Sequence, residues 1–212
     1  MDYDYAIIGS GFGGSVAALR LAQKGYNVVV IEAGRRWTAE ALPRSSWDLR
    51  KYLWKPSLRL FGIQRMDLLR HALVLGGAGV GGGSLVYGNT LFMPMDGFFK
   101  APQIARIGGF ESLNPYYQLA LRMLGAVPNP SLQTPDELLR ATAETYGRGD
   151  TFTPSPVAVW FDKPGQPSSD PYFLGQGPDR VGCTSCGSCF TGCRVGAKNT
   201  LDRNYLFLAE SL

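Results

Sequence analysis

Three glycines near the start of the chain and one later acid could bind a nucleotide. Gly9, Gly11 and Gly14 form a GxGxxG motif, and Glu32 follows 18 residues after the last of them. In a β-α-β unit the first glycine makes a tight turn, the second lets the backbone approach a pyrophosphate, and the third lets the helix pack on the strand. The helix N-terminus offers free N–H groups to the phosphates, and a carboxylate ending the second strand hydrogen-bonds a ribose. The pattern predicts a dinucleotide site.

A second glycine-rich stretch, "GGAGVGGGS" at 76–84, bears on which dinucleotide is bound. NAD needs only one pyrophosphate loop. A buried flavin also needs backbone packed along its ribityl chain and ring, where side chains would clash. The position of the first motif at the extreme N-terminus is common in flavoproteins. These two features favour FAD.

All four cysteines lie within eleven positions, at Cys183, Cys186, Cys189 and Cys193. Their spacing, C-x2-C-x2-C-x3-C, is that of a bacterial ferredoxin run and predicts these thiols as ligands of an iron–sulfur cluster. However, Arg194 stands where ferredoxins have proline, and the chain has no second run. Zinc and reduced thiols without a metal remain as alternatives. Disulfides are not expected in a cytoplasmic chain.

Hydrophobic patterning predicts the elements that position the nucleotide motif. We expect a strand over residues 4–8, a helix that Gly25 closes at its C′ position, and a strand over 27–34. Residues 35–70 are expected to be irregular with short helices. The uncharged stretch 72–95 is rich in glycine, which predicts a buried loop between strands rather than a membrane span.

Two helices and a short strand are predicted further on, outside the β-α-β unit. One helix starts with Asn114 as N-cap and Pro115 in its first position. The other starts with a capping box of Thr134 and Glu137. We assign these helices and the strand-like residues 155–161 to a second lobe that faces the substrate.

The predicted fold class is α/β, an incomplete FAD-binding Rossmann-like domain with part of a substrate-binding lobe. The expected domains are the N-terminal part of the FAD-binding domain at 1–96, substrate-lobe elements at 97–180, and a Cys-rich segment with a helix returning to the FAD domain at 181–212. That last helix stops without a C-cap, which predicts a truncated chain.

Composition and net charge bear on the class of protein and on its binding partners. A chain with 45% hydrophobic and 18% charged residues is typical of a soluble globular protein. A net charge of +4 without a Lys/Arg run gives no sign of nucleic-acid binding. The N-terminus lacks a signal peptide, so a cytoplasmic location is expected. No transmembrane segment is predicted.

The sequence resembles a known family. "IIGSGFGGSVAALRLAQKGYNVVVIEAG" and "GGAGVGGGSLVYGNTLF" are similar to the glucose–methanol–choline oxidoreductases. "SSWDLRKYLW", "FGIQR", "DPYF" and "GCRVGAKNTLDRNYLFLAE" resemble the cholesterol-oxidase-like bacterial branch of that family. The resemblance runs along nearly the whole chain.

The resemblance implies non-covalent FAD and oxidation of a sterol-like or other alcohol. Hydride would pass to flavin N5, and oxygen would accept the electrons to give hydrogen peroxide. Contacts to the ADP half would come from Phe12, Gly13 and Glu32, together with the glycines of the first motif. The loop beside the flavin ring would contain Gly83, Ser84, Tyr87, Gly88, Asn89 and Thr90.

Two departures from the family pattern affect function. Tyr87 stands where cholesterol oxidases commonly have Asn, with Asn89 two positions on. The family's catalytic histidine comes from the C-terminal half of proteins more than twice this length, and His71, the single histidine, matches no catalytic position. We therefore expect no catalytic residue in this chain, which alone would be inactive.

Two other functions remain open. One is a flavin dehydrogenase that passes electrons through a Cys-bound cluster to a quinone or cytochrome. The other is a catalytically silent FAD-binding fragment. Peripheral membrane contact by a loop is compatible with a sterol-directed enzyme.

Overall fold

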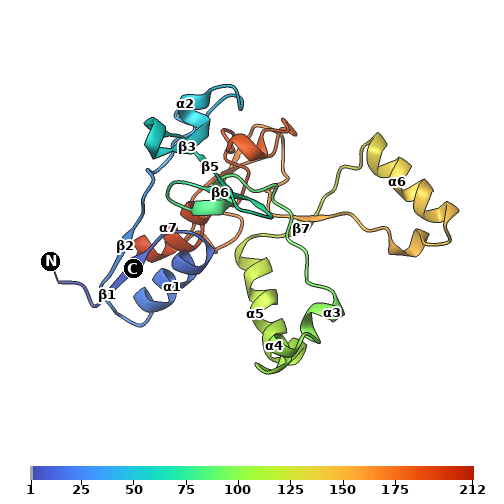
Figure 1. The fold of residues 1–212 in the computed structure, drawn as a ribbon, viewed down its shortest axis with the longest axis horizontal. Coiled ribbons are helices and arrows are strands. Elements are labelled where there is room, and N and C mark those ends of the chain that lie inside the picture. Colours follow the sequence, from blue (N-terminus) through green and yellow to red (C-terminus); the bar gives the residue numbers. More distant parts are fainter. Residues whose placement is uncertain (1) are drawn as a thin grey trace. The chain divides into compact units, whose positions relative to one another are not determined.

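The structure, a computed structural model, describes residues 2–212 and divides them into two compact units (Figure 1). The first unit combines the chain up to Asn89 with Val159–Leu212, and the second is Thr90–Ala158. These limits differ from the boundaries at 96 and 180 expected from the sequence, since residues 159–180 share a unit with the glycine motif. The role of the second unit as a substrate lobe stays a prediction.

The first unit begins with the predicted β-α-β arrangement, which confirms an α/β fold of Rossmann type. Strand β1 (Tyr5–Ile8), helix α1 (Phe12–Ala22) and strand β2 (Val28–Ile31) follow one another, and the two strands pair in parallel from Tyr5↔Val28 to Ile8↔Ile31. The helix ends one residue earlier than predicted. Gln23 is the C-cap, so Gly25 lies one position past C′, where its φ of +85° turns the chain toward β2.

Residues 53–77 form a small sheet, so the expectation of an irregular excursion over 35–70 was wrong for this part, although the expected short helices are present. After α2 (Leu49–Tyr52), strands β3 (Leu53–Lys55), β4 (Leu60–Phe61), β5 (Gln64–Leu68) and β6 (Leu73–Gly77) pair in the order β4-β3-β5-β6, with a 3-10 turn at Pro56–Leu58. These strands are too short to show a period of two. They are held by cross-strand contacts such as the edge-to-face pair Trp54–Phe61.

Strand β6 also corrects the expectation of a buried loop over 72–95. Leu73, Val74 and Leu75 lie in this strand and are exposed. The glycine-rich loop begins only after the strand, and it contains a 3-10 turn at Gly82–Leu85.

A buried cluster supports the start of this loop. Its members are Trp37, Leu42, Ile63, Leu85 and Val86. The indole N–H of Trp37 donates to the Ala78 carbonyl over 3.0 Å, which ties the segment after β2 to the loop.

The rest of the first unit returns to the β-α-β core. Strands β9 (Pro167–Ser168) and β10 (Arg180–Val181) pair antiparallel, followed by 3-10 turns at Cys189–Thr191 and Leu201–Arg203. Helix α7 (Tyr205–Glu210) packs against α1. The last segment therefore lies in the same unit as the glycine motif.

The second unit is mainly helical, with α3 (Asp96–Phe99), α4 (Pro102–Ala105), α5 (Gly109–Met123) and α6 (Thr134–Thr145). Strands β7 (Val127–Pro128) and β8 (Pro156–Val157) pair antiparallel, and a 3-10 turn spans Gly149–Thr151.

Both predicted helix starts in this unit need correction. Helix α5 begins at Gly109, so Asn114 is not its N-cap and Pro115 lies inside the helix. The preceding turn stays helical because Phe110 and Tyr117, seven residues apart, both pack edge-to-face on Phe99.

The capping box of α6 lies one residue earlier than predicted. Gln133 is the N-cap, and its backbone N–H donates to the Asp136 carboxylate over 2.8 Å. Thr134 and Glu137 were therefore the wrong pair.

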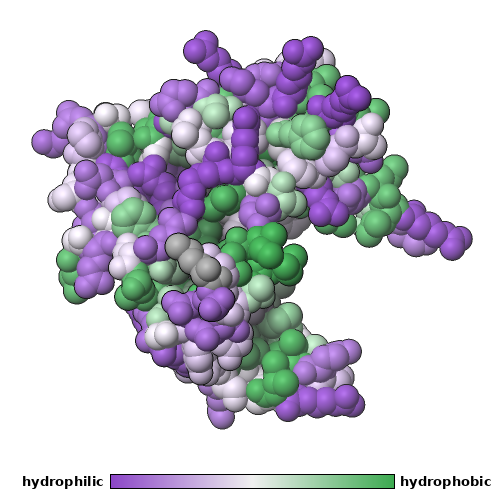
Figure 2. All heavy atoms as spheres, turned by 90° about the vertical axis from the view of Figure 1, so that its left-hand side faces the viewer, coloured by the Kyte–Doolittle hydropathy of each residue, from purple (hydrophilic) through white to green (hydrophobic). Residues whose placement is uncertain are grey.

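Apolar side chains reach the surface near the β1–β2 pair. Ile8 and Ile31, which end the two strands, are 80% and 53% exposed. Figure 2 views the molecule from the side where these strands lie and shows apolar surface between polar side chains. None of the helices within residues 2–212 has the length and apolar character to cross a membrane.

Candidate functional site

The first glycine turn has the geometry that a nucleotide motif requires. Gly9 has a φ of +88°, and its N–H donates to the Ile31 carbonyl over 2.8 Å. A Cβ on Gly14 would lie 2.0 Å from the Gly9 carbonyl oxygen. Only glycine at this third position lets α1 approach the turn so closely.

The second glycine faces open space. Gly11 is the N-cap of α1, and a Cβ there or on Gly13 would meet no atom within 4 Å. Among the residues that the structure describes, no side chain caps this helix start. The N–H groups of the first turn are therefore available to a negatively charged ligand.

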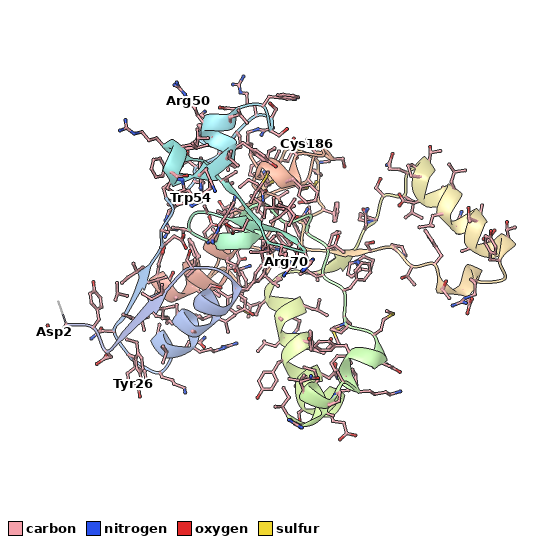
Figure 3. All side chains as sticks on the ribbon, in the orientation of Figure 1. Asp2, Tyr26, Arg50, Trp54, Arg70 and Cys186 are labelled. Atoms are coloured by element: carbon pink, nitrogen blue, oxygen red, sulfur yellow. The ribbon has the colours of Figure 1, made fainter. Side chains whose placement is uncertain are left out.

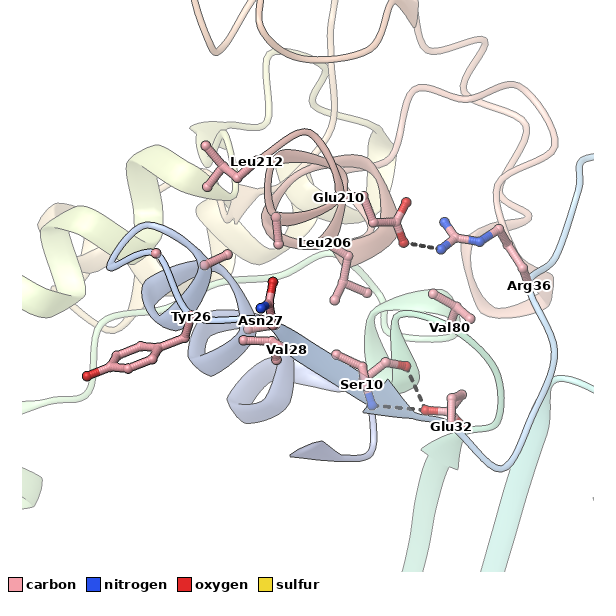
Figure 4. Close-up of a pocket in the computed structure, with 15 residues that line it drawn as sticks. Ser10, Tyr26, Asn27, Val28, Glu32, Arg36, Val80, Leu206, Glu210 and Leu212 are labelled. Atoms are coloured by element: carbon pink, nitrogen blue, oxygen red, sulfur yellow. Dashed lines mark hydrogen bonds and ion pairs between the residues drawn. The ribbon is translucent and has the colours of Figure 1, made fainter. Parts of the chain in front are cut away.

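Glu32 lies directly after β2, beside this turn (Figure 4). Its carboxylate accepts the N–H of Gly34 and the N–H of Ser10, each over 3.0 Å, and the Ser10 hydroxyl over 2.6 Å. Burial alone would raise the pKa of Glu32, but these hydrogen bonds outweigh it and hold the pKa below its usual value. The group is therefore an anion at neutral pH, suited to accept hydrogen bonds from ribose hydroxyls.

Ser10 is a site residue that the sequence reasoning missed. Its side chain is 1% exposed, and besides donating to Glu32 it accepts the Gly81 N–H over 3.0 Å. It occupies a variable position of GxGxxG, so the motif itself gives no signal for it. Its hydroxyl connects the first glycine turn, β2 and the second glycine loop.

The two glycine-rich loops therefore meet. A Cβ on Gly82 would lie 2.7 Å from Cα of Gly11, so the backbones are in direct contact. The ring of Phe12 lies edge-to-face on Tyr87, with centroids 5.9 Å apart, and faces Gly83. The structure thus brings together the two sets of residues predicted for the two halves of the cofactor.

Ser84 and Tyr87 of the second loop have their hydroxyl groups hydrogen-bonded within the protein. Ser84 is fully buried; its hydroxyl donates to the Gly81 carbonyl and accepts the Leu201 N–H. The Tyr87 hydroxyl donates to the Asn199 carbonyl over 3.0 Å, and burial raises its pKa.

Asn89 differs from these residues because part of its side chain has no partner. It is buried in a left-handed conformation, with φ +67°, and its Oδ1 accepts no hydrogen bond from the described residues. Its Nδ2 donates to Sγ of Cys189 over 3.0 Å. Thr90 belongs to the second unit, so its predicted contact with a flavin stays a prediction.

The four thiols do not form a metal centre in this arrangement. Within residues 2–212 no group of three or more His, Cys, Asp or Glu side chains is arranged to hold a metal ion. Cys186 is exposed (Figure 3), whereas Cys183, Cys189 and Cys193 are half-buried. Burial raises the pKa of Cys183, and a hydrogen bond from the Ser188 N–H lowers that of Cys186. An iron–sulfur cluster stays a prediction of the spacing alone.

A buried lysine joins the cysteine segment to the second glycine loop. Lys198 is 1% exposed, and its Nζ donates to the carbonyls of Leu85 and Tyr87, each over 3.0 Å, and to that of Cys189 over 2.8 Å. Burial lowers the pKa of this ammonium to about 8. Nothing in the sequence pattern marked Lys198 as different from other lysines.

Two further features complete the first unit. A cavity of about 420 Å³ opens beside Ser10 and Glu32, between α1, β2 and α7 (Figure 4). His71, the single histidine, is exposed in the turn between β5 and β6. It takes part in none of the contacts between the two glycine loops described above.

Comparison with known proteins agrees with the Rossmann-type fold. Residues 7–49 match the family model of an NAD(P)-binding Rossmann-like domain. The chain is 55% identical to a cholesterol oxidase of Mycobacterium tuberculosis and 46% identical to a cholesterol oxidase of Acinetobacter baumannii, over 99% of its length in both cases. An uncharacterized GMC-type oxidoreductase of M. tuberculosis is 39% identical over 43% of the chain.

The chain belongs to the glucose–methanol–choline oxidoreductase family. It spans 37% and 38% of the length of the two cholesterol oxidases it matches. Membership of this family implies a flavin cofactor. The residues fit such a group, because Gly11 leaves space at the start of α1, that helix start has no side-chain cap, and Glu32 is ionised.

Proposed function

We propose that the protein to which this chain belongs is an FAD-dependent oxidoreductase that oxidises the CH–OH group of a sterol or similar alcohol to a ketone. In this proposal molecular oxygen is the electron acceptor and hydrogen peroxide the second product. The observation that carries the proposal is the meeting of the two glycine loops through Ser10, Gly11 and Gly82. NAD would need only one glycine-rich loop, for its pyrophosphate. FAD, with its ribityl chain and buried flavin ring, would need both glycine-rich loops. The names of the relatives support the sterol substrate.

The residues that would hold FAD follow from their positions. The open backbone of Gly11 and Gly13 and the N-terminus of α1 would bind the pyrophosphate. The carboxylate of Glu32 would accept hydrogen bonds from the adenosine ribose. When bound, FAD supplies a two-electron acceptor.

The second loop would shape the environment of the flavin ring. Phe12 and Tyr87, whose rings are in edge-to-face contact, would supply an apolar wall, and Gly83 leaves room beside Phe12. Gly88 and the buried Asn89 would line the same region. The unpartnered Oδ1 of Asn89 is available to accept a hydrogen bond from a bound group. No acid–base residue for the hydroxyl proton is assigned within this chain.

The test is a parallel measurement of product, oxygen and cofactor. The protein expressed from its complete reading frame is incubated with cholesterol in air, and ketone, oxygen uptake and peroxide are quantified. We expect one peroxide for each ketone and a flavin absorption spectrum. Ketone formed only with an added dye, without peroxide, would instead support the dehydrogenase alternative. A spectrum without flavin would overturn both readings.

A further inference from the structure

The segment that contains all four cysteines is attached directly to the second glycine loop. Sγ of Cys189 accepts the Nδ2–H of Asn89 over 3.0 Å, and the next residue, Phe190, places its ring 3.1 Å from where a Cβ on Gly88 would lie. The Lys198 ammonium binds the Cys189 carbonyl together with the Leu85 and Tyr87 carbonyls. A change at Cys189 therefore reaches residues 85–89 through three separate contacts.

Cys186 is the solvent-accessible cysteine of this segment. It is the exposed thiol of the four, and two residues separate it from the half-buried Cys189. The chain bends at the intervening Gly187, whose φ is +67°. The C-x-x-C spacing is the one used by dithiol–disulfide pairs.

We propose that Cys186 and Cys189 form a peroxide-oxidised dithiol site that controls the order of the loop at residues 85–89. The Cys186 sulfur attacks one oxygen of hydrogen peroxide, the O–O bond breaks, and the leaving hydroxide takes the thiol proton to give a sulfenic acid and water. The Cys189 sulfur then attacks the Cys186 sulfur, and hydroxide leaves with the Cys189 proton as a second water. Two thiols lose two electrons, and the peroxide gains them.

Oxidation weakens the contact that holds Asn89. A disulfide sulfur is a poorer acceptor than a thiol or thiolate, and closing the Cys186–Cys189 loop moves Sγ away from Nδ2. Oδ1 of Asn89 already has no partner among the described residues, so the whole buried amide would lose its hydrogen bonds. The loop that contains Gly88 and Asn89 is then expected to loosen.

The experiment treats the protein from its complete reading frame with hydrogen peroxide and maps its thiols by alkylation and peptide mass spectrometry. Added peroxide makes the result independent of the proposed oxidase activity. We expect two of four thiols to be lost and a disulfide within one peptide, about 2 Da lighter than the reduced form, that fragmentation assigns to Cys186 and Cys189. Amide hydrogen exchange in residues 85–89 should become roughly fivefold faster, the change expected for one lost hydrogen bond.

Matched variants separate this site from general thiol oxidation. Cys186→Ser and Cys189→Ser should each abolish this disulfide and the change in exchange, whereas Cys193→Ser should retain both. Three results would overturn the proposal: no thiol loss with peroxide, equal loss in Cys186→Ser, or bound iron or zinc in amounts matching the protein, which would make these thiols metal ligands.

Discussion

The Ser10 hydroxyl donates to Oε2 of Glu32 over 2.6 Å and at the same time accepts the N–H of Gly81 over 3.0 Å. One buried side chain of the glycine motif thereby orients the carboxylate predicted to bind ribose and fixes the loop predicted to contact the flavin. The two glycine-rich loops, about seventy residues apart in sequence, are held together by this contact in addition to the backbone contact between Gly11 and Gly82.

Replacing Ser10 tests this dependence. Ser10→Ala leaves a buried N–H on Gly81 without its acceptor, so the free energy of unfolding should fall by about 1–3 kcal/mol, and flavin should dissociate more readily. Urea unfolding and fluorimetric titration with FAD measure the two effects. Ser57→Ala, at an exposed serine, is the control and should change neither. Unchanged FAD affinity in Ser10→Ala would show that Glu32 and the loop hold their positions without the hydroxyl.

Substitutions of two motif glycines should have opposite effects on folding and binding. At Gly11 an added Cβ meets no protein atom, so Gly11→Ala should change the unfolding free energy by less than about 1 kcal/mol yet abolish flavin binding. At Gly14 the Cβ would clash with the Gly9 carbonyl, so Gly14→Ala should destabilise the fold by about 3 kcal/mol.

The control for this pair is Gly97→Ala, at an open glycine of the second unit, which should retain both stability and flavin. Absorption of the bound flavin after gel filtration, with thermal unfolding of each variant, makes the comparison. Gly11→Ala protein that is folded and still retains flavin would refute the predicted pyrophosphate site.

The chain's local patterns predicted the β-α-β unit because its strand–glycine–helix pattern is continuous in sequence. The same patterns failed where distant contacts decide the structure. Helix α5 extends before Pro115 because Phe99 packs on both sides of the proline, and β3 and β4 exist through a pairing that includes Trp54 and Phe61. Neither contact has a signal in a single short window.

The candidate site shows the same division. Gly9, Gly11, Gly14 and Glu32 could be chosen from spacing, because each has a role set by the motif. Ser10 and Lys198 could not, since a serine in a variable position and a lysine look like surface residues until the second loop is packed against them. The metal prediction for the cysteines came from spacing alone, and spacing does not determine whether the sulfurs converge.

The hydrogen bonds to Glu32 predict a pH dependence. The pKa of Glu32 is lower in the folded protein than its ordinary value of 4.5, so the unfolded chain takes up the proton first as pH falls. The resulting stabilisation is complete above about pH 5.5 and is lost as pH falls through 4.5 and then through the folded pKa. The difference in unfolding free energy between the wild type and Glu32→Gln should therefore shrink below pH 4.5. Urea unfolding of both proteins from pH 3.5 to 6.5 measures it, and a difference that grows toward low pH would contradict the assignment.

Two opposing contributions to stability meet at Lys198: the cost of burying its charge and the hydrogen bonds that its ammonium group donates. Burial lowers its pKa from 10.5 to about 8, so removing the charge relieves about 3 kcal/mol at neutral pH. Against this, Lys198→Met leaves the carbonyls of Leu85 and Tyr87 without their donor, whereas that of Cys189 keeps the N–H of Gly192 at 3.3 Å. The three hydrogen bonds to the charged ammonium contribute about 6 kcal/mol in total.

The lost hydrogen bonds outweigh the relieved burial. We therefore expect Lys198→Met to be about 3 kcal/mol less stable than the wild type in urea unfolding at pH 7, with faster hydrogen exchange in residues 85–89. Lys100→Met, at an exposed lysine, should lie within about 0.5 kcal/mol of the wild type. A Lys198→Met protein as stable as the wild type would mean that the carbonyls of Leu85 and Tyr87 find other donors, and that the remaining contacts, such as the hydrogen bond from Asn89 to Cys189, are enough to hold the cysteine segment on the second glycine loop.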